Sequence, residues 1–434
     1  MVNIFRNIFV SVLAMLLFCD IASSQIIVAL DPATEVGPIK MMNAANNGPY
    51  KDNLEAYKAL RVPYARTHDT PHRWNSHTVD INQLFPNWDA DVNSPESYDF
   101  TLTDSLLVDM MNAGTKPFFR LGQSIEHAAK KYGIYPPKDF KKWAQICEHV
   151  IRHYNEGWAD GHQWNIEYWE IWNEPDLDAP DERWKTDPRC WGGPLELFHE
   201  FYEVAAKHLK GCFPHLKIGG PAFANPRKYG PPFLDHVKAT GTPLDFFSWH
   251  TYDTVENNIH YAHYAREMLD KYGFKSTETT CNEWLPSVPM RGTYHQAAEI
   301  AAVMLAYQNL PVDSAMIYDA RCGVSNYSPL FNPETKKPYP AYYSLAAFGR
   351  LYKLGNQVEL TCDDEDVYAV AATDGKRGCL MISNHKEEAK PLSITANGDE
   401  FITLITADGR VDSATPLPKE LPANSVLSVM YTLR

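Results

Sequence analysis

The sequence lacks several patterns that would each point to a class of protein. Its 8 cysteines include no C-x-x-C pair, which argues against a structural zinc site. No Gly-rich loop follows an early apolar run, which argues against a dinucleotide-binding sheet. Basic residues are not in excess: the formal net charge is −14, which disfavours nucleic acid and anionic membranes as partners.

The chain also lacks internal repeats, low-complexity linkers and any second long apolar run. Its one long run stands at the N-terminus, where Arg6 precedes apolar residues 8–18 and Ala-Ser-Ser follows. This order predicts a secretory signal peptide over residues 1–24, hence export to the periplasm or the extracellular space. The run is too short for a membrane-spanning helix. Cys19 allows a lipid anchor as the less favoured alternative, because the bulky residue before it fits a lipobox poorly.

Seven cysteines remain after this cleavage, and they are widely spaced: Cys147, Cys190, Cys212, Cys281, Cys322, Cys362 and Cys379. One or two disulfides are compatible with an exported protein. Because the number is odd and no pair is close in sequence, we favour buried free thiols.

Short apolar runs alternate with amphipathic stretches over most of the chain. The runs cover residues 38–45, 62–69, 115–122, 166–174, 216–222, 244–250, 276–283 and 313–320, with helical patterns such as 140–155 and 295–310 between them. Alternating strands and helices predict a parallel sheet. Eight such units predict an α/β fold, a (β/α)8 TIM barrel over residues 38–344. A doubly wound open sheet is the alternative.

Beyond residue 345 the pattern changes to short alternating runs with Asp-Gly and Asn-Gly turn signals. This pattern predicts an antiparallel β-sandwich domain over residues 345–434. The early run at 26–31 lies in a segment, 25–37, that we expect to join this domain.

Carboxylates end two of the predicted barrel strands, and barrel active sites lie where strands end. Side chains alternate along a strand, so Glu170, Trp172 and Glu174 are expected to share one inward face. The same rule turns Glu283 inward and Glu278 outward, toward the helices. Glu174 and Glu283 stand three strand–helix units apart, at the ends of the fourth and seventh strands. Paired carboxylates across a pocket are what glycosidic bond cleavage needs.

The motifs around these residues resemble glycoside hydrolase family 39, in the clan A retaining glycosidases. "EIWNEPD" resembles the clan's fourth-strand acid/base motif, and "ETTCNEWLP" its seventh-strand nucleophile motif. "ARTHD" and "SWHTY" resemble family 39 in particular, as does the trailing β-sandwich. The chain departs from the family pattern at His68-Asp69 and at the residues flanking Glu283, Asn282 and Trp284. These departures leave the sugar undetermined.

The resemblance implies that Glu174 is the general acid/base and Glu283 the nucleophile of a retaining double displacement. It also implies that Asn173 hydrogen-bonds the sugar 2-hydroxyl. From the strand geometry we expect Tyr252 or His250 to donate a hydrogen bond to Glu283. Arg66 is expected to pair with Glu170 or Glu283.

Further candidates follow from their places at strand ends. We expect sugar contacts from His68, Gln123, Glu126, His127 and Asp319, and flat faces for sugar stacking from Trp284 and Tyr318. For each of these the ordinary alternative is a structural or solvated role. No metal ligand cluster is evident, and we expect neither a catalytic metal nor another cofactor.

The predicted activity is retaining cleavage of terminal sugars from plant-type oligo- or polysaccharides, β-xylosidase-like, with arabinosyl and galactosyl linkages open. Carbohydrate is the expected partner, and the sequence leaves the oligomeric state undetermined. Aromatic-rich loops at 72–101 and 176–194 favour a walled pocket and exo action. The alternatives are an endo-acting clan A glycanase and a non-catalytic carbohydrate-binding pseudoenzyme.

Overall fold

The computed structural model of the 434-residue chain describes residues 25–49, 53–70, 77–321, 327–395, 401–406, 409–413 and 416–433. The predicted signal peptide, residues 1–24, lies outside the described residues. Among the described residues, no helix has both the length and the apolar character needed to cross a membrane.

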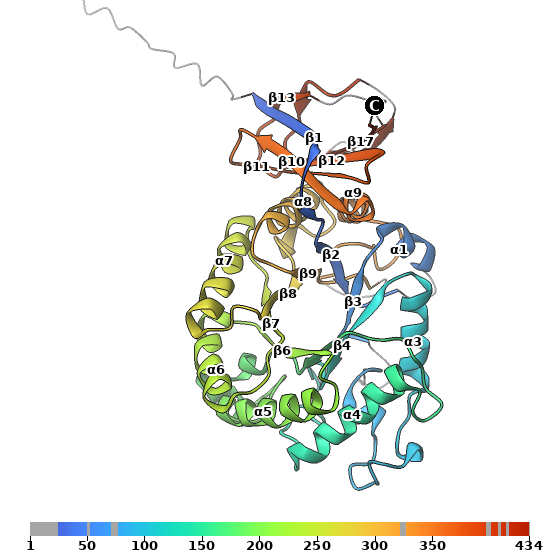
Figure 1. The fold of residues 1–434 in the computed structure, drawn as a ribbon, viewed down its shortest axis with the longest axis vertical. Helices are drawn as coiled ribbons and strands as arrows, with labels where there is room; N and C mark the ends of the chain where they lie inside the picture. Colours follow the sequence, from blue (N-terminus) through green and yellow to red (C-terminus); the bar gives the residue numbers. More distant parts are fainter. Residues whose placement is uncertain are drawn as a thin grey trace, which may run out of the picture.

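Eight parallel strands close into a barrel, as the sequence predicts (Figure 1). They are β2 (Met41–Asn46), β3 (Tyr64–Thr67), β4 (Lys116–Leu121), β5 (Tyr168–Ile171), β6 (Lys217–Phe223), β7 (Phe246–Thr251), β8 (Glu278–Trp284) and β9 (Ser314–Ile317). Pairing of β2 with both β3 and β9 closes the barrel. This confirms the TIM barrel over the open-sheet alternative.

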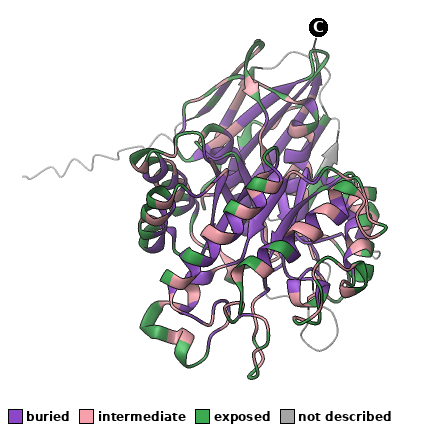
Figure 2. Ribbon diagram, turned by 60° about the horizontal axis from the view of Figure 1, so that its bottom comes forward, coloured by how far each residue is buried: buried purple, intermediate pink, exposed green. Residues whose placement is uncertain are grey.

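Helices form a ring around these strands, with their exposed faces outward (Figures 1 and 2). They are α1 (Leu54–Leu60), the short α2 (Ile81–Leu84), α3 (Thr101–Asn112), α4 (Phe140–Glu156), α5 (Leu195–Cys212), α6 (Pro226–Thr240), α7 (Val255–Tyr272), α8 (Tyr294–Asn309) and α9 (Pro340–Leu354). Local signals set their ends: Asp139 accepts the backbone N–H groups of Lys141 and Lys142 at the start of α4, and Gly157 takes a left-handed backbone after its end.

The second part of the chain is a mostly antiparallel sheet of nine strands. They are β1 (Ile26–Pro38), β10 (Asn356–Cys362), β11 (Val367–Thr373), β12 (Arg377–Asn384), β13 (Lys390–Thr395), β14 (Phe401–Thr406), β15 (Gly409–Ser413), β16 (Glu420–Leu421) and β17 (Ser425–Thr432). The N-terminal strand β1 pairs with β10 and β13, so the first and the last described strands both belong to this sheet. The predicted boundary at 344/345 falls within α9, and the sheet resumes at Asn356.

This sheet packs against the barrel through α8 and α9 (Figure 1). Side chains alternate along β12: Cys379 and Met381 join the core of the barrel part, whereas Leu380 and Ile382 join the sheet's own core. Because α8 lies between strands and sheet, every residue from Gln296 to Gln308 is buried, which suits its alanine-rich sequence. The six cysteines that the structure describes carry free thiols.

The barrel interior is built in layers. At the N-terminal end of the strands an apolar layer contains Ala44, Tyr64, Phe118, Tyr168, Phe246 and Met316. Two residues further along β3, β5 and β7 the inward residues are Arg66, Glu170 and Ser248, all fully buried. The apolar layer closes the barrel below, so the polar side chains above it face the C-terminal end.

Candidate active site

Glu174 lies beyond the end of its strand rather than in it. Strand β5 ends at Ile171, and Trp172 and Glu174 both have a left-handed backbone, with φ 74° and 45°. Pro175 then begins a 3-10 turn, η4 (Pro175–Asp178). The predicted alternation therefore fails after Ile171: Trp172 packs against aromatic residues Trp143, Trp191 and Phe201, not into the barrel.

Glu283 reaches the barrel interior because β8 contains a register shift. His250 of β7 pairs with Glu283, although the preceding pair joins Trp249 to Cys281, so Asn282 is the extra residue. The Asn282 amide consequently donates to Glu170, while Glu283 contacts Arg66. The expectation that Glu278 faces the helices is wrong for the same reason. Its carboxylate accepts from the inward-facing Tyr168 hydroxyl at 3.0 Å.

Arg66 connects Glu283 at the barrel mouth with Glu170 beneath it. Its Nε donates to Glu170 at 2.6 Å, and Nη1 donates to Glu283 at 3.1 Å. Its Nη2 donates to the Asn173 Oδ1 atom at 2.7 Å, which fixes the amide so that Nδ2 faces away from Arg66. That Nδ2 is buried and has no hydrogen-bond partner in the described structure. Arg66 therefore pairs with both of the carboxylates proposed as its partners, Glu170 and Glu283. The Asn173 amide keeps Nδ2 as an unpaired donor among the described residues.

Glu283 is supplied with donors that favour its ionised form. The Tyr252 hydroxyl donates to Oε1, and Arg66 donates to Oε2. Burial raises the pKa of Glu283 to about 7, with Glu174 adding to the rise and His250, Arg66 and Tyr252 opposing it. Of the two donors predicted for Glu283, Tyr252 is the one that makes this hydrogen bond, while His250 contacts Glu174.

Glu174 has fewer such partners. His250 Nδ1 lies 2.8 Å from Glu174 Oε1 and 3.6 Å from Glu283 Oε2. Burial lowers the pKa of His250 to about 4, so the ring is neutral near pH 7. Burial likewise raises the pKa of Glu174 to about 7, against the opposing charge of Arg66. Since two neighbouring buried carboxyls titrate as a pair, one proton is shared near neutrality. The donors on Glu283 place that proton on Glu174.

A cavity of ≈ 610 Å³ opens over the two carboxylates. Its walls come from the loops after the strands: His68, Asp69, His77, Ile125, His127, Glu174, Leu177, Arg189, Tyr252, Glu283, Val288, Tyr318, Arg321 and Tyr327. The rings of Tyr252, Tyr318 and Tyr327 meet edge to face, with centroids 5.5–6.1 Å apart, and form one wall. The cavity thus offers both aromatic and polar surface, as carbohydrate sites commonly do.

The structure brings five of the predicted contact residues to this cavity or its carboxylates: His68, His127, His250, Tyr252 and Tyr318. Trp284 does not line it. The ring is fully buried and lies edge to face with Tyr307 of α8, because it points to the opposite side of β8 from Glu283. Trp284 therefore offers no stacking face to a sugar.

Three other predicted contacts have structural roles instead. Asp319 is fully buried and accepts from Arg321 Nε at 2.6 Å. Glu126 accepts the backbone N–H groups of Tyr132, Gly133 and Ile134, and so shapes its own loop. Gln123 donates to Asp80 at 2.7 Å, outside the cavity. None of the three lines the cavity.

Sequence reasoning missed several residues that do line the cavity, including Asp69, Arg189, Arg321 and Tyr327. Asp69 accepts from the Tyr318 hydroxyl and lies 3.6 Å from Arg321. Burial raises its pKa, but the charges of His68 and Arg321 outweigh burial and hold the pKa below its usual value. These residues come from loops, where spacing carries no strand periodicity; only proximity to the strand-end motifs could have flagged Asp69.

Glu174, His250 and Glu283 each place a possible ligand atom within 4.8 Å of the others, a spacing that a metal ion could also use. The cation Arg66 already contacts Glu283, and His250 already contacts Glu174. Arg66 is the cation on Glu283, while the neutral His250 ring contacts Glu174, and this arrangement suits acid/base and nucleophilic chemistry.

Comparison with known proteins agrees with the family resemblance of the sequence motifs. A family model described as Glycosyl hydrolases family 39 matches residues 36–326. A beta-xylosidase of Caldicellulosiruptor saccharolyticus is 27% identical over 336 residues, 68% of this chain and 65% of the relative. A beta-xylosidase of Geobacillus stearothermophilus is 29% identical over 166 residues, 36% of this chain and 31% of the relative. The chain thus spans less than two thirds of either relative's length.

A solved structure extends the likeness over the whole fold. The glucosidase from Croceicoccus marinus superposes with a TM-score of 0.77 at 22% identity, covering 95% of this chain and 100% of that one. At this identity the likeness concerns the fold: a barrel with an attached sheet.

Proposed function

Because the chain belongs to glycosyl hydrolases family 39, we propose that it is a retaining glycoside hydrolase that releases a terminal β-linked sugar from plant-type oligo- or polysaccharides. Xylose is the sugar that we propose first, since both curated relatives compared above are beta-xylosidases. The N-terminal pattern supports action outside the cytoplasm, after removal of residues 1–24.

The observation that carries this proposal is the spacing of the two carboxylates. An oxygen of Glu174 and one of Glu283 lie within 4.8 Å of each other at the base of one cavity. Retaining glycosidases hold the two carboxyl groups about 5–5.5 Å apart, whereas inverting enzymes need about 6.5–9.5 Å to admit a water. The spacing favours direct attack on the sugar by one carboxylate.

The proposed reaction has two steps. Protonated Glu174 gives its proton to the glycosidic oxygen while Glu283 attacks the anomeric carbon, forming a covalent glycosyl-enzyme and releasing the leaving group. Glu174, now ionised, then takes a proton from water, which displaces Glu283 and gives a product of the original configuration. Asn173 Nδ2, oriented by Arg66 and free of partners, is placed to donate to the sugar 2-hydroxyl.

Hydrolysis of 4-nitrophenyl β-xyloside, β-glucoside, β-galactoside and α-L-arabinofuranoside, with the first-formed anomer read by NMR, tests the proposal. We expect turnover of the xyloside with retention. Net inversion would overturn the mechanism, and preference for another glycoside would reassign the sugar. Large oligomeric products from xylan would indicate endo action. Oligosaccharide binding without turnover on any substrate would indicate a binding protein.

Two variants test the separate roles. Glu283→Ala is expected to abolish turnover of every substrate. Glu174→Ala is expected to retain turnover of substrates with good leaving groups, and azide is expected to restore it by forming a β-glycosyl azide. The reverse pattern would exchange the two roles.

A further inference from the structure

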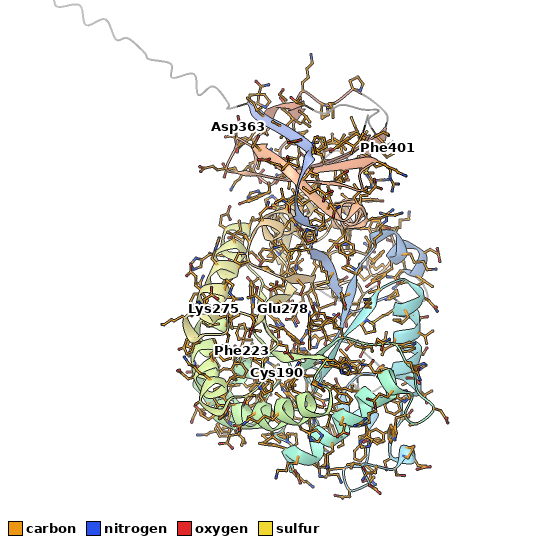
Figure 3. All side chains as sticks on the ribbon, viewed as in Figure 1. Cys190, Phe223, Lys275, Glu278, Asp363 and Phe401 are labelled. Atoms are coloured by element: carbon orange, nitrogen blue, oxygen red, sulfur yellow. The ribbon has the colours of Figure 1, made fainter. Side chains whose placement is uncertain are left out.

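Arg189 is held rigidly at the wall of the active-site cavity. Its backbone N–H donates to Asp178 Oδ2 at 2.8 Å, and its carbonyl accepts from the Glu126 N–H at 2.8 Å. The next residue is fixed as well, since the Trp172 indole donates to the Cys190 carbonyl at 2.8 Å. Figure 3 labels Cys190 within the barrel part, far from Asp363 and Phe401 of the second sheet. The backbone therefore presents the Arg189 side chain from a fixed point.

Among the residues that the structure describes, the guanidinium of Arg189 has no anionic partner. No carboxylate of the described residues lies within 4.0 Å of it, and its Nε is shielded from solvent without a hydrogen-bond partner. The other cavity arginine is different, because Arg321 is neutralised by Asp319 at 2.6 Å and by Asp69 at 3.6 Å. A shielded donor without a partner costs free energy, so a group from outside the chain is its natural complement.

The position of Arg189 indicates which part of a substrate it meets. Arg189 and Leu177 belong to the loop that follows Glu174, whereas Tyr252 and Tyr318 line the cavity beside Glu283. An acid/base protonates the oxygen of the departing group, so the surface on its side holds the leaving-group sugar. Arg189 and Glu174 line the same cavity, and the positive charge of Arg189 acts to lower the pKa of Glu174.

We propose that Arg189 binds an anionic substituent, a carboxylate or a sulfate, on the leaving-group sugar. This inference rests on the proposed function and narrows its substrates to acidic oligosaccharides. A planar guanidinium matches the paired oxygens of a carboxylate or sulfate and can bind them through two parallel hydrogen bonds. The net charge of −14 does not oppose this, because Arg189 provides a local positive charge at the cavity wall.

A matched pair of aryl glycosides tests the inference. The 4-nitrophenyl and 3-carboxy-4-nitrophenyl β-glycosides of the preferred sugar differ by one negative charge on the leaving group. For the wild type we expect kcat/KM to favour the carboxylated substrate about tenfold or more, the scale of a charged hydrogen bond. Arg189→Gln is expected to remove this ratio, and Arg189→Lys to retain part of it.

Arg183→Gln is the matched control. Arg183 lies in the same loop, in η5 (Pro180–Lys185), but it is 38% exposed and does not line the cavity. It contacts Asp187 at 3.2 Å and, more distantly, the oxygen of Asp178 that does not hold Arg189, at 3.8 Å. We expect this variant to keep the wild-type ratio. A ratio near one in the wild type, or an unchanged ratio in Arg189→Gln, would overturn the inference while leaving the proposed function intact.

Two disaccharides distinguish the sources of the anion. Both carry the preferred sugar at the non-reducing end, joined either to a hexuronate or to a 6-sulfated hexose. Calorimetric binding to the wild type and to Arg189→Gln, with the neutral hexose disaccharide as reference, shows which anion loses affinity. If no glycoside is hydrolysed, the proposed function fails and this binding comparison still decides: equal affinities, or no binding of either acidic disaccharide, would overturn the inference.

Discussion

The guanidinium of Arg66 lies 3.1 Å from the Glu283 carboxylate, and the same group reaches Glu170 at 2.6 Å. All three side chains are almost or entirely buried. One cation therefore serves a structural carboxylate below and a reactive one above, and Tyr252 adds a second donor to the reactive one. These donors favour the ionised form of Glu283, whereas the close side-chain partner of Glu174 within the described part of the chain is a neutral imidazole. The difference between two chemically identical side chains is set by these neighbours.

Tyr252→Phe should move the acidic limb of the pH profile. The Tyr252 hydroxyl lowers the pKa of Glu283, so its removal raises that pKa and leaves the nucleophile protonated to a higher pH. We expect the acidic limb of kcat/KM to shift upward, with activity at pH 5 reduced about tenfold or more, measured from pH 4 to 9. Tyr264→Phe, on the outer surface where its hydroxyl meets the Arg227 carbonyl, is the control. An unmoved acidic limb would contradict the assignment.

The basic limb should report Glu174. Burial raises the pKa of Glu174 from 4.5 to about 7, so the acid keeps its proton up to about pH 7 and loses it above. We therefore expect kcat/KM to fall as pH rises through about 7, because the leaving group then lacks its proton donor. In Glu174→Ala, assayed with a leaving group that needs no protonation, the fall should disappear. A basic limb that survives this variant would belong to another group.

The barrel and its two carboxylates were predictable because they depend on repeated patterns. Eight apolar runs separated by helical spacing predicted the closed sheet, and the fixed motifs at 173–175 and 282–284 predicted Glu174 and Glu283. Both features are encoded locally, by periodicity or by adjacent residues. They need no knowledge of how distant loops meet.

Strand periodicity misled where the backbone leaves regular geometry. The extra residue in β8 turns Asn282 and Glu283 both inward and reverses the expected side of Glu278. The left-handed backbone at Trp172 ends alternation one residue after β5. Neither a bulge nor a positive φ at tryptophan has a sequence signature. Loop residues such as Arg189 lie outside any periodic pattern.

Glu170→Gln should destabilise the fold more than it alters substrate contacts. Its carboxylate accepts from Arg66, Ser248 and Asn282 with no exposed surface, and removing one partner of a buried ion pair costs about 3–5 kcal/mol. We expect a loss of that order in the free energy of unfolding from urea titration. Glu278→Gln is the control: its pair with Lys217 is partly exposed, so about 0–1 kcal/mol is expected. A loss of only about 0–1 kcal/mol in Glu170→Gln would contradict a stabilising role of the Glu170 network.

Asp178→Ala should loosen the wall that carries Arg189. One oxygen of Asp178 accepts the backbone N–H groups of Arg189, Cys190 and Trp191 at 2.8, 2.6 and 2.9 Å, and the side chain is fully buried. Leaving buried N–H groups without a partner costs about 1–3 kcal/mol each, so we expect a clear fall in Tm.

The same variant tests whether Asp178, besides stabilising the fold, also positions Arg189 for substrate binding. If the fixed backbone is what positions Arg189, Asp178→Ala should also raise KM for substrates with a large leaving group more than it lowers kcat. The control is Asp187→Ala in the same loop, where an exposed side chain pairs with Lys131 and Arg183, so its loss should leave Tm close to that of the wild type. A lower Tm with unchanged KM would mean that Asp178 stabilises the fold without positioning the cavity wall. Since three donors converge on one oxygen directly behind Arg189, we expect both effects together.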